Sequence, residues 1–220
     1  MASEYSAVLQ GPRLSPLAGS ATGLAILLHG YGSNGADMIA FARHVQPLFP
    51  QLEFFAPDAP LGLGPTGRRW FELSSLSITA IWGGVREAAP ALSQLIDTER
   101  DRLGIADRQI VLIGFSQGTI MALHVGLRRR APVGAILGYS GMLAGGPAQL
   151  ADITARPPVT LIHGSQDQVV PLVAMQAGAA ALQAAGVPVR TLVVPDLGHT
   201  IDPQGLAAGV EVLRSVFVRH

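Results

Sequence analysis

The stretch IVLIGFSQGTIMALHV, residues 110–125, decides how this chain folds, because an apolar run ends there in one serine between two glycines. Val, Ile and Leu fill the run before Gly114, which is typical of a strand buried on both faces. A helical pattern follows Ser116, so the stretch predicts a strand, a sharp turn and a helix. The motif G-x-S-x-G alone is a weak signal in a chain with 26 Gly, and its surroundings must decide whether Ser116 is a nucleophile.

The composition excludes several classes of protein. Hydrophobic residues make up 49% of the 220 residues and charged residues 14%, against about 25% charged in an average globular chain, which indicates a large core. The net charge is zero, so we expect no binding to nucleic acid. The one basic run, LRRRAP at 127–132, is interpreted as the end of a helix, where Arg complements the helix dipole, in preference to a phosphate-binding patch.

The chain contains neither Cys nor Lys, and all 15 basic residues are Arg. A thiolate zinc site, a cysteine nucleophile, a Schiff-base lysine and a phosphate-loop lysine are therefore excluded. The beginning of the sequence has no basic start followed by an apolar stretch, and no apolar run approaches the ~18 residues of a membrane span. We therefore expect a cytoplasmic protein without a membrane span.

Short apolar runs alternate with longer helical patterns along the chain. The predicted strands are residues 24–30, 52–57, 109–114, 133–140, 158–164 and 189–195, and the predicted helices are residues 35–48, 82–103, 117–130, 172–185 and 203–218. This alternation predicts an α/β fold, with a mostly parallel central sheet and helices on both faces, in a single domain over residues 1–220.

Two segments interrupt the alternation and are too long for ordinary connections. They are residues 58–81 and 140–157, and both are rich in Gly and Pro. Long loops in a compact domain are usually functional or disordered. Trp70 and Phe71 favour an ordered, lid-like loop over a pocket in the first segment.

A serine nucleophile needs a base and an acid that orients the base. The six histidines occupy different contexts: His44 and His124 lie in helical patterns, His29 and His163 end strands, His220 is terminal, and His199 lies in a loop after the last strand. We therefore predict His199 as the base, since a loop can carry an imidazole over the strand ends.

The acid is expected between the serine and the histidine in the sequence. Asp167, in HGSQDQVVP, directly follows a predicted strand and is the best candidate. Asp196 is interpreted as a turn former, and Asp202 as a helix N-cap because Pro203 follows it. The order Ser116, Asp167, His199 is that of the α/β-hydrolases.

The glycine-rich segment LLHGYGSNGADM, residues 27–38, allows two interpretations. It can be a plain turn from strand to helix, with Asn34 or Gly35 near the helix start. It can also present backbone N–H groups to a developing oxyanion, and the triad candidate favours this second role. We predict the N–H groups of Tyr31 and Gln117 as the two oxyanion donors.

These motifs together resemble the phospholipase/carboxylesterase family, which includes the acyl-protein thioesterases and small bacterial carboxylesterases. The shared segments run over nearly the full length: LLHGYGSNGADM, FFAPDAP, GRRWFEL, IVLIGFSQGTIMAL, LIHGSQDQVVP and LGHTID. The resemblance implies an α/β-hydrolase fold, with Ser116 as nucleophile, Asp167 as acid, His199 as base, and the amides of Tyr31 and Gln117 as the oxyanion hole.

The resemblance also implies a role in substrate binding for two further residues. It places Trp70 of the W-F-[DE] element near the acyl pocket, and Val169, two residues after the acid, in contact with substrate. Where the thioesterase branch has H-G-L-G-D, this chain has HGYGSN, which is closer to the bacterial carboxylesterases.

The expected activity is therefore hydrolysis of short- to medium-chain carboxylic esters, through an acyl-enzyme and without a metal or cofactor. Two alternatives remain: a lysophospholipase or acyl-protein thioesterase on the same scaffold, and a non-catalytic binding protein with a hydrolase-like fold. Loss of a triad residue would mark the latter, and none is lost. The apolar final helix, GLAAGVEVLRSVFVRH, is interpreted as covering the sheet, with a homodimer as the alternative.

Overall fold

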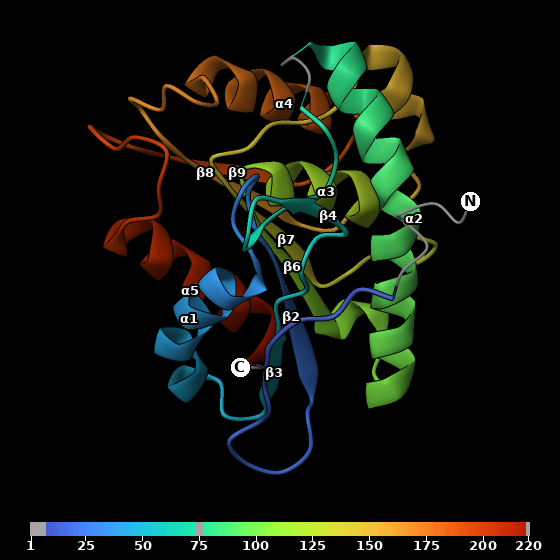
Figure 1. Cartoon of the computed structure of the whole chain (residues 1–220), viewed down its shortest axis with the longest axis vertical. Helices are drawn as coiled ribbons and strands as arrows, with labels where there is room; N and C mark the ends of the chain where they lie inside the picture. The colour runs from blue at the N-terminus through green and yellow to red at the C-terminus, as the bar shows by residue number, and fades with distance from the viewer. Residues whose placement is uncertain (1–7, 74–76, 219–220) are drawn as a thin grey trace.

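The computed structural model describes residues 8–73 and 77–218, and a seven-stranded sheet forms its centre (Figure 1). Its strands, in spatial order, are β1 (Arg13–Leu14), β3 (Leu52–Phe55), β2 (Gly23–Leu28), β6 (Ile110–Phe115), β7 (Ala135–Tyr139), β8 (Val159–Gly164) and β9 (Val189–Val194). Only the pair of β1 with β3 is antiparallel, and the other neighbouring pairs are parallel. The predicted α/β fold with a mostly parallel sheet is confirmed.

Helices cover both faces of the sheet, as the sequence predicts. On one face lie α1 (Gly35–Val45) and α5 (Pro203–Phe217), and on the other α2 (Ile78–Leu103), α3 (Gln117–Gly126) and α4 (Leu172–Ala184) (Figure 1). Strand β2 shows why both faces are apolar. Leu24, Ile26 and Leu28 enter the core below α2 and α3, whereas Ala25 and Leu27 enter the core below α1 and α5.

Side-chain caps fix where several helices begin. Asn34 Oδ1 accepts from Asp37 N–H at 3.0 Å at the start of α1. Asp202 Oδ1 accepts from Gly205 N–H at 2.7 Å at the start of α5, with Pro203 in the first helical position. The cap at Asp202 is the one that the sequence predicts, and Asn34 is one of the two residues expected near the start of the first helix. In both caps a short polar side chain satisfies an N–H that the helix leaves free.

The segment predicted as a lid-like loop, residues 58–81, has more regular structure than expected. It contains a hairpin of β4 (Leu61–Leu63) and β5 (Gly67–Arg69), and its last residues belong to α2. Helix α2 begins at Ile78 because Ser77 Oγ accepts from Ala80 N–H at 3.2 Å. Residues 74–76 of the segment lie outside the described part of the chain. The second long segment, residues 140–157, contains the short 3-10 helix η4 (Pro147–Asp152).

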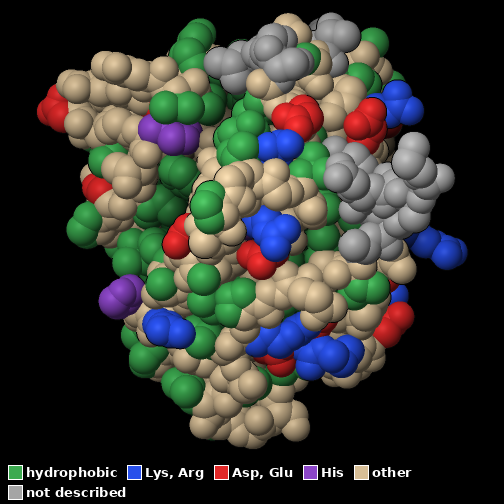
Figure 2. Space-filling view, viewed as in Figure 1, with side chains coloured by type: hydrophobic (Ala, Val, Ile, Leu, Met, Phe, Trp, Pro, Cys, Tyr) green, Lys and Arg blue, Asp and Glu red, His purple; other side chains and the backbone are tan. Residues whose placement is uncertain are grey.

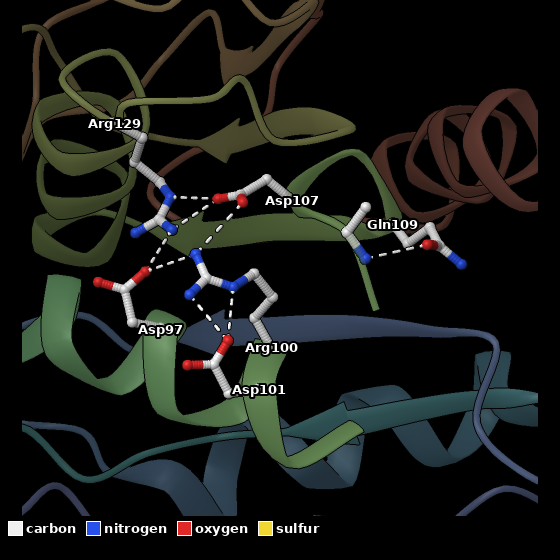
Figure 3. A network of polar contacts seen from close by, with 7 residues as sticks. Asp97, Arg100, Asp101, Asp107, Gln109 and Arg129 are labelled. Carbon is white, nitrogen blue, oxygen red and sulfur yellow. Dashed lines mark hydrogen bonds and ion pairs between the residues drawn. The ribbon is translucent and has the colours of Figure 1, made fainter. Parts of the chain in front are cut away.

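The basic run at 127–132 lies beyond α3, which ends at Gly126 and not at 130 as predicted. Arg128 Nη1 donates to His124 O at 3.2 Å, so the run does bind the last carbonyls of the helix. Arg129 is buried and contacts Asp97 of α2 at 2.8 Å and Asp107 at 2.6 Å (Figure 3). These two carboxylates compensate the charge of Arg129 and join α2 to the end of α3.

The face shown in Figure 2 carries no single dominant charge. Basic and acidic side chains are interspersed over this face, and the net charge of the chain is zero. Helix α5 packs on β7 and β9 and so covers the sheet, and the homodimer stays a prediction. Among the described residues, no helix combines the length and the apolar character needed to cross a membrane.

Candidate active site

Ser116 occupies a strained turn between β6 and α3. Its φ of 53° and ψ of −116° lie in a backbone region that residues other than glycine rarely adopt. Ser116 N–H donates to Tyr139 O of the neighbouring strand at 2.9 Å, which fixes the turn to the sheet. The strained backbone raises the Ser116 side chain at the carboxyl edge of the parallel strands, where α/β sheets bind ligands.

The two glycines of the motif are required by close backbone contacts. A Cβ atom on Gly114 would lie 2.4 Å from Thr119 N, and one on Gly118 would lie 2.0 Å from Leu28 O. Both distances are far below van der Waals contact, so only glycine allows α3 to start this close to β2 and β6. The spacing of G-x-S-x-G is therefore a consequence of the turn, and the motif is not a chance match.

Asp167 follows β8, and both oxygens of its buried carboxylate accept hydrogen bonds. Oδ2 accepts from His199 Nδ1 at 2.7 Å, and Oδ1 accepts from the N–H groups of Val169 and Val170 at 2.9 Å each. Burial acts to raise the pKa of Asp167, but the bonds from His199, Val170 and Val169 outweigh it, and the net pKa is lowered. The carboxylate therefore stays ionised and can stabilise an imidazolium.

His199 lies in the loop between β9 and α5, at the same edge of the sheet as Ser116. Because Asp167 can only accept, Nδ1 of His199 carries a proton, and in the neutral ring Nε2 presents a lone pair. The imidazole packs on Phe115, with ring centroids 4.9 Å apart. Ser116 Oγ makes no hydrogen bond to any described residue and is free to turn toward Nε2; such bonds often form only when substrate is present.

A cavity of about 320 Å³ opens beside Ser116 and His199. Part of its wall is apolar and includes Leu73, Ile81, Ile120, Met142 and Val170. Among the described residues that line it, none is an acid or an arginine, so the cavity fits an uncharged, apolar group.

The structure brings most of the predicted site residues to this cavity. Ser116, Gln117, Tyr31, Val169 and His199 all line it, and Asp167 lies behind His199. Trp70 is completely buried, so it lies beneath the surface of the site and is not exposed to solvent. Its predicted role in substrate binding stays a prediction.

The amides predicted as oxyanion donors are both available. No described residue accepts from the N–H of Tyr31 or from that of Gln117, which is the first residue of α3 and adds the positive end of the helix dipole. The loop that carries Tyr31 is held by a hydrogen bond from Gly32 N–H to Arg68 O of β5, at 2.8 Å. Two free N–H groups on one cavity are suited to bind an oxyanion.

Sequence reasoning missed the polar contacts that fix this oxyanion region. The Gln117 side chain accepts from Trp70 N–H and donates to Phe71 O, both at 2.8 Å. Trp70 Nε1 donates to His29 O at 3.0 Å. The segment around Trp70 is therefore bonded to both chain segments that carry an oxyanion amide. The sequence signal for these contacts is the polar Gln117 at the start of α3, a helix of mostly apolar residues.

His29 completes these contacts from the end of β2. Its Nε2 accepts from Ala59 N–H at 3.0 Å, so Nδ1 carries the proton and donates to Gly30 O at 2.7 Å. Burial is the main cause that lowers the pKa of His29, and the ring is neutral. His29 therefore holds the start of the 58–73 segment beside the oxyanion loop.

The sheet order, the strained serine after β6 and the acid and histidine after two later strands are those of an α/β-hydrolase. The chain belongs to the phospholipase/carboxylesterase family, because the family's model matches residues 12–216. The resemblance inferred from the motifs is thereby confirmed.

Proteins similar to this chain include esterases and an acyl-protein thioesterase. Esterase YpfH of Escherichia coli (strain K12) is 29% identical over 198 residues, which cover 90% of this chain and 84% of the relative. Acyl-protein thioesterase 1 of Gibberella zeae is 29% identical over 215 residues, covering 89% of this chain and 91% of the relative. The crystal structure of esterase PE8 is 36% identical in sequence to this chain, with a TM-score of 0.91, and the match covers 96% of this chain and 100% of that structure's chain. The protein is an esterase- or thioesterase-type hydrolase.

Proposed function

We propose that the protein is a serine carboxylesterase that hydrolyses short- to medium-chain carboxylic esters through Ser116, His199 and Asp167. The observation that carries this proposal is the 2.7 Å hydrogen bond from His199 Nδ1 to Asp167 Oδ2, beside a strained serine on the same cavity. With its Nδ1 atom bonded to Asp167, the neutral His199 ring has a lone pair on Nε2, which supports His199 as the base for Ser116.

In the proposed reaction, His199 Nε2 takes the proton of Ser116 Oγ as this oxygen attacks the carbonyl carbon of the ester. The N–H groups of Tyr31 and Gln117 bind the oxyanion, each contributing roughly 3 kcal/mol of transition-state stabilisation. His199 then donates its proton to the leaving alcohol, which gives the acyl-enzyme. A water molecule, activated by His199 in the same way, releases the carboxylic acid and restores Ser116.

The walls of the cavity support an uncharged acyl group as the part of the substrate that is recognised. Leu73, Ile120 and Met142 offer apolar surface beside Ser116, and Val169, with 54% of its surface exposed, lies at the rim. Apolar contacts of this kind favour an alkyl chain, whereas an anionic acyl group would find no cation among the described lining residues.

A thioesterase is the second candidate, since acyl-protein thioesterase 1 of Gibberella zeae matches 89% of this chain, against 90% for esterase YpfH. The same machinery serves both, because only the leaving group differs. A lysophospholipase on this scaffold would also keep the triad.

Steady-state kinetics on p-nitrophenyl esters of increasing chain length, beside an acyl thioester of matched length, test the proposal. We expect kcat/KM to be highest for short to medium esters and to vanish in Ser116→Ala. A strong preference for long acyl thioesters would establish the second candidate. Turnover of esters by folded Ser116→Ala at the wild-type rate would refute both.

A further inference from the structure

A second histidine lies against the acid of the proposed triad. His163, in β8, is completely buried and has its Nε2 atom 2.8 Å from Val170 O and 3.3 Å from Asp167 Oδ2. A carbonyl oxygen can only accept, so Nε2 of His163 must carry the proton and donate it to Val170 O. The same Nε2 atom also lies close to Asp167 Oδ2, the oxygen that binds His199.

His163 closes a ring of contacts around the acid. Its Nε2–H binds the carbonyl of Val170, and the N–H of Val170 in turn binds Asp167 Oδ1 at 2.9 Å. One carboxylate oxygen is thus fixed through Val170, and the other lies between His163 and His199. Asp167 lies in the turn from His163 to Val170, and the hydrogen bond between these two residues joins the two ends of the turn.

The other ring nitrogen shows that His163 is not explained by packing alone. Its Nδ1 atom is buried and has no hydrogen-bond partner among the described residues. A buried acceptor without a partner is unfavourable, and an apolar side chain would fill the same space without this cost. The favourable contribution of the imidazole must therefore come through Nε2–H.

We propose that His163 is a positioning residue, which holds the Asp167 carboxylate so that Oδ2 accepts from His199 Nδ1. This inference rests on the proposed function, because it concerns the orientation of the base in the triad. Without the His163 N–H, the turn can relax and the carboxylate can rotate away from His199. Substrate binding does not depend on this contact, because His163 is buried behind the acid and has no exposed surface in the cavity.

Two variants of matched length separate the hydrogen bond from the volume. His163→Met fills the site but removes the donor, whereas His163→Gln returns an amide N–H near the position of Nε2. We expect His163→Met to lower kcat about tenfold, the usual effect of one hydrogen bond near a charged group, with KM unchanged. His163→Gln is expected to recover most of kcat.

The spectroscopic readout concerns the proton between His199 and Asp167. Its downfield resonance in the proton NMR spectrum is expected to be strong in the wild type, lost or moved upfield in His163→Met and restored in His163→Gln. His124→Met serves as the control, because His124 is also a buried histidine with an unpartnered Nδ1 but lies on α3, away from the acid. This control is expected to leave both kcat and the downfield resonance unchanged.

Several results would overturn the inference. Wild-type kcat in folded His163→Met would do so, and so would an equal loss in the Met and Gln variants. If His163→Met does not fold, nitrogen NMR of the wild type still decides, because a proton on Nδ1 of His163 contradicts the inferred contact. Failure of the proposed function would give a different result. The wild type itself would not hydrolyse esters or thioesters, whereas the tautomer of His163 would be unaffected.

Discussion

At the scale of single residues, backbone geometry distinguishes the serine motif from a serine in an ordinary loop. Ser116 has a positive φ, and the flanking glycines lie against the backbone of Thr119 and Leu28. A serine in an ordinary loop needs neither feature. The strain at Ser116 is balanced by the contacts of the surrounding strands and helix, which is a common arrangement at catalytic positions.

Gly118→Ala tests this close contact directly. The new Cβ would lie 2.0 Å from Leu28 O, so β2 and α3 must separate, and we expect a loss of about 3 kcal/mol in the free energy of unfolding. Gly83→Ala is the matched control, because no atom lies near its new Cβ and alanine favours a helix by about 1 kcal/mol. Urea unfolding of both variants gives the comparison. Equal stability of the two variants would show that α3 does not approach β2 this closely.

The sequence points more clearly to candidate site residues that follow a strand than to histidines that end one. Ser116, Asp167 and His199 could be predicted as a triad because each comes after a strand and their order is distinctive. His29 and His163 give no such signal. Whether a histidine at a strand end binds a nearby turn depends on the conformation of that turn, which the sequence does not reveal.

At the scale of elements, buried strands were predictable and the 58–73 segment was not. Long runs of Val, Ile and Leu mark β2, β6 and β8, because both of their faces are covered. The hairpin of β4 and β5 has three-residue strands of Gly, Leu and Arg, which carry no periodic pattern. Its structure arises from contacts with distant parts of the chain.

The 58–73 segment contains two positions that can be separated by mutation. Leu73 lines the cavity, so we expect Leu73→Ala to move the ester preference toward longer acyl chains. Trp70 is completely buried and binds His29 and Gln117, so Trp70→Phe is expected to lower kcat and stability through the lost Nε1–H bond, with acyl-chain preference unchanged. Chain-length profiles and melting temperatures distinguish the two. A changed profile in Trp70→Phe would support the direct role in substrate binding that the family resemblance implies.

At the scale of the whole molecule, a buried histidine makes stability depend on pH. His124 of α3 packs on Trp82, with ring centroids 5.1 Å apart, and its pKa is lowered to about 4, first by burial and then by Arg128 and Arg86. The unfolded chain binds this proton with a pKa of about 6.5. The contribution of the neutral His124 ring to the free energy of unfolding is therefore fully present above about pH 6.5 and is lost as the pH falls through about 4.

His124→Leu tests this dependence. We expect the variant to lose less of its free energy of unfolding than the wild type between about pH 7 and about pH 4, by roughly 3 kcal/mol at most. Urea unfolding at several pH values gives both curves. Parallel curves would mean that the pKa of His124 is the same in the folded and the unfolded protein, in contradiction to its buried contact with Trp82.

The most direct test of the proposed function is labelling by a fluorophosphonate, which reacts with a serine only when a base and an oxyanion hole activate it. Mass spectrometry of the labelled wild type is expected to show one adduct, on Ser116. Ser116→Ala and His199→Ala are expected to remain unlabelled while keeping their folded circular dichroism spectra. A folded wild type that stays unlabelled, or an adduct on another serine, would contradict the assignment of Ser116 as the nucleophile.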